Sequence, residues 1–89
     1  MAALNKPYPE LARRLRYAYR NGLPGYRTYT EMAERFSADN AIRAERCSSL
    51  LAAGTVQRWV STGRFPDRLE LLLHRLLDDD GVPRNPPEE

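Results

Sequence analysis

The sequence predicts a small all-α domain of about five helices. Apolar residues recur at spacings of three and four along several segments, which is the period of an amphipathic helix. Gly22, Gly63 and Gly81 follow three of these segments and indicate where helices end. No segment is a convincing strand. The chain has 89 residues, which is enough for one domain.

The first predicted helix begins at Tyr8-Pro9-Glu10, because proline suits the first helical position and glutamate suits the positive end of the helix dipole. We expect residues 1–7 to form a flexible arm. The inward stripe of the helix consists of Leu11, Leu15, Ala18 and Tyr19. The arginines on the rest of its surface indicate a solvated face, with phosphate contact as the alternative: Arg13, Arg14, Arg16 and Arg20.

A second helix is predicted near residues 28–36, where Thr28 and Glu31 fit a capping box. Its inward residues are Met32, Ala33 and Phe36. A third helix is expected from Ala41 to about Ser48, capped by Asp39 or Asn40. Continuation of the second helix is the alternative. The inward residues of this third segment would be Ile42, Ala44 and Cys47.

The fourth predicted segment opens at Ser48 or Ser49 and ends at Gly63, with Pro66 shortly after. Its apolar residues include Leu50, Leu51, Val56, Trp59 and Val60. We expect Asp67 to cap a last helix that carries Leu69, Leu71, Leu72, Leu73, Leu76 and Leu77. The domain would then cover residues 8–80, and residues 81–89, rich in Pro and Glu, would form a disordered tail.

Charge is distributed unevenly along the chain. The formal net charge is +2. Residues 78–89 hold five acidic residues and one arginine, a net charge of −4, so residues 1–77 carry +6. A positive body of this kind favours a polyanionic partner.

Several classes of function are disfavoured by composition. The single Cys47 cannot form an internal disulfide, which fits a reducing compartment, and it leaves too few ligands for a metal site. No apolar run approaches the roughly 18–20 residues that span a bilayer, and no secretion signal is evident. We therefore expect a cytoplasmic protein. His74 is the one histidine and lies among leucines, so we expect neither catalysis nor a cofactor.

Two segments carry a family pattern. Residues 28–36 contain Thr-x-x-Glu-Met-Ala, and residues 50–66 contain Thr-Val-Gln-Arg-Trp-Val-x-x-Gly-Arg-Phe-Pro. Together they resemble the helix-turn-helix DNA-binding proteins of the Cro/repressor or excisionase type. The resemblance implies that the first segment braces the DNA backbone and that the second lies in the major groove. Val56 and Trp59 would then be the buried anchors of this recognition helix.

The spacing between the two segments departs from the family pattern. The small residue of the first motif helix usually precedes the valine of the second by ten positions, which is Arg46 here. Ala33 is a better match, but it lies 23 positions before Val56. This implies an insertion of about thirteen residues in the turn. The alternative is that residues 42–49 form the first motif helix in a degraded form.

The predicted DNA contacts come from the resemblance and from side-chain chemistry. Gln57 can pair with adenine and Arg58 with guanine. Thr55 and Ser61 can donate to phosphate oxygens, and Arg64 can neutralise a phosphate. The alternative for each is an ordinary solvated surface. The full predicted set is Ala53, Thr55, Gln57, Arg58, Ser61, Thr62 and Arg64.

These observations predict a sequence-specific transcriptional regulator that binds double-stranded DNA, most naturally a repressor of phage, plasmid or mobile-element origin. The leucines from Leu69 to Leu77 lie on more than one helix face, which predicts a homodimer through that helix. The alternative is a protein-binding adaptor or host-factor inhibitor on the same scaffold. The insertion and four tyrosines favour it: Tyr17, Tyr19, Tyr26 and Tyr29. A third possibility is an architectural role in recombination.

Overall fold

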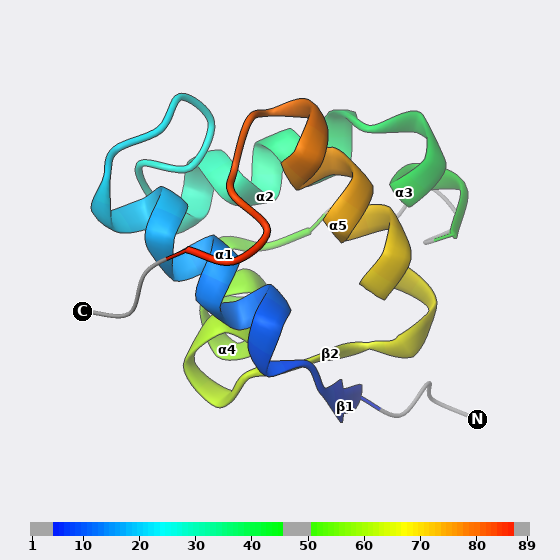
Figure 1. Ribbon diagram of the computed structural model, residues 1–89. Helices are drawn as coiled ribbons and strands as arrows, with labels where there is room; N and C mark the ends of the chain where they lie inside the picture. Colours follow the sequence, from blue (N-terminus) through cyan, green and yellow to red (C-terminus); the bar gives the residue numbers. More distant parts are fainter. Residues whose placement is uncertain (1–4, 46–50, 87–89) are drawn as a thin grey trace.

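The computed structural model describes residues 5–45 and 51–86. These residues form five α-helices, a short two-stranded sheet and one 3-10 turn (Figure 1). The predicted fold of about five helices is therefore confirmed. The helices are α1 (Pro9–Arg20), α2 (Tyr29–Ala38), α3 (Asn40–Glu45), α4 (Ala53–Thr62) and α5 (Glu70–Asp79). Within the described ranges, none of them is both long and apolar enough to cross a membrane.

The sheet corrects the expectation that the chain contains no strand. Strand β1 (Asn5–Pro7) pairs antiparallel with β2 (Arg64–Pro66), and Lys6 lies opposite Phe65. Three residues are too few to show an alternating pattern, so neither strand could be recognised from the sequence. Residues 5–7 are thus tied to the domain and do not belong to a loose arm. Residues 1–4 lie outside the described part.

Helix α1 begins as predicted, with Pro9 in its first turn. Leu11, Leu15 and Ala18 are buried, but Tyr19 is 40% exposed. The expectation of a wholly solvated arginine face is wrong for Arg14, whose side chain is completely buried. Arg14 lies three positions after Leu11 and therefore falls on the buried stripe of the helix.

Helices α2 and α3 are separated by a capping aspartate. The Thr28 hydroxyl oxygen accepts from the Glu31 N–H at 3.0 Å and begins α2, as the capping box predicted. The Asp39 carboxylate accepts from the Ile42 N–H at 3.0 Å, so α3 is a new helix and not a continuation. Ile42 is buried, whereas Ala44 is exposed. Cys47 and Ser48 lie outside the described residues.

The last helix begins later than expected. Asp67 does not cap it, because its carboxylate accepts from the Tyr8 hydroxyl and pairs with Lys6 at 3.6 Å. The 3-10 turn Asp67–Leu69 (η1) leads into α5 at Glu70. Most of the leucines are covered within one chain: Leu69, Leu73, Leu76 and Leu77 are buried, Leu72 is half-buried and Leu71 is 74% exposed.

The segment after α5 packs back onto the domain. Val82 and Pro86 are buried, and in Figure 1 this red segment crosses α1. The Arg14 guanidinium donates to the carbonyl oxygens of Val82 at 2.8 Å and Pro83 at 3.1 Å. The prediction of a disordered tail is therefore wrong for residues 81–86, and residues 87–89 lie outside the described part.

The helix packing distinguishes the two interpretations of the spacing. Helix α4 packs chiefly against α2, and also against α1 and β2. Helix α3 packs against α2, α5 and η1. Ala33 and Val56 are buried in the same hydrophobic core. The helix of Ala33 is therefore the main packing partner of α4, and α3 belongs to the segment that connects α2 to α4.

Candidate nucleic-acid interface

Helix α4 has one buried face and one exposed face. Val56, Trp59 and Val60 are buried, and the Trp59 ring lies against Phe65 with 6.0 Å between ring centroids. The opposite side carries a strip of exposed residues at the helical spacing i, i+3, i+4, i+7. This strip consists of Gly54, Gln57, Arg58 and Ser61. We call it the α4 strip.

Helix α4 has no side-chain cap at its start and ends at a left-handed glycine. Gly63 ends the helix with a φ of 71°, and its N–H donates to the Trp59 carbonyl at 2.8 Å. At the other end, Ala52 provides no side-chain cap. Helix α4 contains no acidic residue, so its exposed side chains are either neutral or positive.

The structure brings three of the predicted DNA contacts together on the α4 strip: Gln57, Arg58 and Ser61. Ala53 and Thr55 are half-buried and lie at its margin. The strip thus carries the two side chains best suited to base edges, an amide and a guanidinium.

The other two predicted contacts lie near the end of α4. Thr62 is exposed, but its hydroxyl donates to the Arg58 carbonyl at 2.7 Å and accepts from the Arg64 N–H at 3.3 Å. Arg64 is exposed on β2, and its Nη1 donates to the Asn5 carbonyl at 3.2 Å. Thr62 therefore has its donor engaged within the chain, whereas Arg64 retains further donors.

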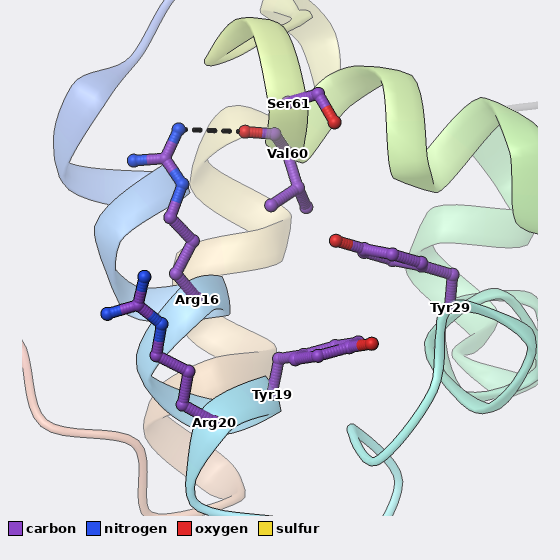
Figure 2. Close-up of a pocket in the computed structure, with 6 residues that line it drawn as sticks. All are labelled: Arg16, Tyr19, Arg20, Tyr29, Val60 and Ser61. Carbon is purple, nitrogen blue, oxygen red and sulfur yellow. Dashed lines mark hydrogen bonds between the residues drawn. The ribbon is translucent and has the colours of Figure 1, made fainter.

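A cleft of about 410 Å³ lies beside the α4 strip, between α1, α2 and α4 (Figure 2). Arg16 Nη2 donates to the Val60 carbonyl at 2.9 Å and joins α1 to α4. The rings of Tyr19 and Tyr29 stack with centroids 4.9 Å apart and planes at 29°. The lining residues are Arg16, Tyr19, Arg20, Tyr29, Val60 and Ser61. We call this the Arg-Tyr cleft.

The Arg-Tyr cleft lies where two acid-free segments meet. Residues 11–30 contain five arginines and no Asp or Glu, and residues 46–66 contain three arginines and no Asp or Glu. The described lining residues come from these two segments. The described lining of the cleft therefore carries two arginines and no carboxylate.

The acidic run at the end of α5 is paired with arginines. Asp78 accepts from Arg14 at 2.6 Å, Arg75 donates to Asp79 at 3.1 Å, and Arg35 binds Asp80 through two hydrogen bonds of 2.9 and 3.0 Å. Hydrogen bonds from Arg14 and then Arg84 hold the pKa of the Asp78 carboxyl below its usual value. These carboxylates thus have cationic partners within the chain, away from α4.

His74 is another partner of buried Arg14. Its Nδ1 lies 2.8 Å from Arg14 Nη1, and its Nε2 lies 3.3 Å from Glu70. A guanidinium can only donate, so Nδ1 accepts and the neutral ring carries its proton on Nε2. Burial and the charge of Arg14 lower the pKa of His74. The geometry fits a structural histidine. In the described ranges, no group of three or more potential metal ligands is found.

Sequence reasoning did not find the Arg-Tyr cleft. Arginines and tyrosines are interleaved along residues 16–29 of the sequence. Tyrosines in such a pattern usually pack at the rim of a small core, so the pattern alone does not predict a cleft. The stronger signal was the absence of acidic residues from residues 11–30. The cleft itself forms from three elements and has no local pattern.

Comparison of the chain with protein-family models, with curated proteins and with solved structures found no significant match.

Proposed function

We propose that this protein is a sequence-specific DNA-binding regulator that places α4 in the major groove. The α4 strip is the observation that carries the proposal. Its exposed Gln57 and Arg58 stand on a helix that is anchored from behind by buried Val56 and Trp59. An α-helix fits the major groove, where base edges are distinguishable.

The chemistry of the strip and its surroundings supports the proposal. Gln57 can bind adenine and Arg58 can bind guanine through paired hydrogen bonds. Ser61 and Arg64 lie farther along and suit phosphate oxygens. Helix α3, which lies in the segment between α2 and α4, packs against α2, α5 and η1. Gln57, Arg58 and Ser61 remain exposed.

Regulation would follow from occupancy of the site. In this proposal the protein acts in the cytoplasm and represses transcription by excluding other proteins from an operator. An origin in a phage, plasmid or other mobile element rests on analogy with the helix-turn-helix family that the sequence resembles. A homodimer through α5 would match a palindromic operator. Most leucines of that helix are covered within one chain, so the proposal of a dimer depends on exposed Leu71.

Selection of bound duplexes from random DNA tests the proposal directly. We expect enrichment of a defined site, with affinity that falls steeply as salt rises. Arg58→Ala is expected to weaken that binding by about 1–3 kcal/mol and to relax the preference at one base pair. Arg43→Ala is the matched control, because Arg43 is exposed on α3 and α3 lies far from α4 in Figure 1. No retention of DNA at low salt would overturn the proposal.

A protein-binding adaptor is the second candidate. The 40% exposure of Tyr19 beside the stacked Tyr29 ring favours it, since tyrosine is enriched at interface hot spots. The DNA-binding experiments separate the two candidates. A DNA-binding regulator would select a duplex and lose affinity for it as salt rises. An adaptor would select no duplex, and Arg58→Ala would leave its function unchanged.

A further inference from the structure

We propose that the Arg-Tyr cleft holds a phosphodiester of the DNA strand that flanks the groove occupied by α4. This inference rests on the proposed function and extends the interface from α4 onto α1. Its central observation is the position of Ser61, which belongs to the α4 strip and also lines the cleft. A duplex lying along the strip therefore passes the mouth of the cleft.

The cleft offers cationic donors on one wall. Arg16 and Arg20 are one helical turn apart, roughly 6 Å along α1, and both are exposed. In Figure 2 the two guanidinium groups stand one above the other on the same side. Arg16 uses one N–H for the Val60 carbonyl, and this bond fixes its direction. Its fork has further donors, and charge-assisted hydrogen bonds to phosphate are strong.

The opposite wall offers hydroxyl groups. In Figure 2 the Tyr29 hydroxyl points toward the space between α1 and α4, and the Ser61 hydroxyl lies above it. Stacking on Tyr19 fixes the Tyr29 ring. Hydroxyl donors of serine and tyrosine, together with arginine, make many of the phosphate contacts in protein–DNA complexes. The arrangement suits a tetrahedral anion held between two walls.

The cleft favours a phosphate that is part of a polymer over a free phosphate ion. Arg16 and Arg20 are exposed, and exposed charges are screened by salt. When α4 already holds a duplex, the phosphate of that duplex reaches the cleft as a second, intramolecular contact. It therefore binds at a much higher effective concentration than a free phosphate ion. None of the described residues that line the cleft is acidic, so the lining itself does not repel a phosphate.

The test uses the duplex recovered by selection and three variants of the full chain. Arg16→Gln and Arg20→Gln remove one cation each, and Arg43→Gln on α3 is the matched control. We expect the negative slope of log affinity against log salt to become shallower by about 0.9 for each lost phosphate contact. Base preference is expected to stay unchanged. Arg20→Gln leaves the hydrogen bond from Arg16 to the Val60 carbonyl in place, so it tests the cleft even if Arg16→Gln fails to fold.

Neutral methylphosphonate linkages placed one at a time in the duplex provide the second measurement. We expect wild-type protein to lose affinity at one flanking position, and Arg20→Gln to be insensitive to the same change. Slopes for Arg16→Gln and Arg20→Gln equal to that of Arg43→Gln would overturn the inference and leave the proposed function standing. Failure to recover any duplex would overturn both. Calorimetric binding of inorganic phosphate that is lost in Arg20→Gln, with the duplex slope unchanged, would assign the cleft to a free phosphate and overturn the DNA contact.

Discussion

Arg14 Nη2 on α1 lies 2.6 Å from Asp78 Oδ1 on α5, although the Arg14 side chain is completely buried. The same guanidinium also donates to the carbonyl oxygens of His74, Val82 and Pro83. One side chain thus joins α1, α5 and the segment that follows α5. Every buried side-chain polar atom in the described part of the chain has a hydrogen-bond partner.

Replacing Arg14 tests whether this network stabilises the fold. Arg14→Met keeps much of the side-chain length but removes the donor that binds three carbonyl oxygens and the Asp78 carboxylate, which is left with Arg84 alone. Because buried groups that lose their partners are costly, we expect the free energy of unfolding to fall by about 3 kcal/mol. Urea unfolding measures it. Arg43→Met, at an exposed site, is expected to change stability by less than about 0.5 kcal/mol. Equal effects of the two substitutions would contradict the prediction.

Acidification below pH about 6.5 is expected to destabilise the protein through His74. Burial, Arg14 and Arg84 lower its pKa in the folded state, against opposing effects of Glu70 and Asp78. Between the ordinary value of 6.5 and the lower folded value, the unfolded chain binds more protons. Stability is therefore full above pH about 6.5 and falls as pH decreases through that window. Urea unfolding at several pH values measures the loss.

The controls for this pH dependence are simple, because the chain has one histidine. Its imidazole resonance in NMR is expected to titrate with a midpoint below 6.5. His74→Gln removes the titrating group, so its stability is expected to be flat across the same window. The lowered pKa values of Asp39, Asp78 and Asp80 act below about 3.8, which separates the two effects. A midpoint above 6.5 would contradict the assignment.

Two glycines at opposite ends of α4 are predicted to respond in opposite directions to alanine. Gly63 has a φ of 71°, and an added Cβ would lie 3.9 Å from the Ala12 Cβ, so Gly63→Ala costs about 1–2 kcal/mol from backbone strain alone. An added Cβ at Gly54 would meet nothing within 4 Å. Gly54→Ala is therefore expected to stabilise the protein by about 0.5–1 kcal/mol, measured by thermal unfolding.

The same Gly54→Ala variant informs the proposed function. Packing within the chain does not require glycine at this position, so close approach of DNA to the backbone is a reason to have it. We expect the variant to be more stable and yet to bind the selected duplex more weakly. Greater stability with unchanged affinity would show that the duplex does not approach Gly54.

Leu71 tests the proposed homodimer. It is 74% exposed on α5, so Leu71→Lys is expected to change the stability of the monomer by less than about 0.5 kcal/mol. If α5 forms the dimer interface, sedimentation velocity will show dimers for the wild type and monomers for this variant. Monomers for both proteins would remove the leucine helix as an interface.

The predictable parts of this fold are those set by local sequence. The Thr28 cap and the Gly63 stop each depend on a few neighbouring residues. The faces of α4 follow from helical period, so the exposure of Gln57 and Arg58 could be anticipated. Such features need no knowledge of the rest of the chain.

Other features depend on partners distant in sequence and could not be predicted. Lys6 pairs with Phe65 across the sheet, and burial of Arg14 requires acceptors from residues 74–83. The Arg-Tyr cleft likewise requires α1, α2 and α4 together. No local pattern encodes these three arrangements.

The long connection between α2 and α4 has a consequence for the freedom of the chain. Residues 39–52 join the two helices. Loop-closure entropy rises slowly with length, by about 0.6 kcal/mol for each doubling. Buried Ile42 and the Asp39–Arg75 pair, 2.8 Å apart, anchor this connection near its start. Side-chain packing against α2 therefore sets the orientation of α4, and the connection can vary in length at small entropic cost.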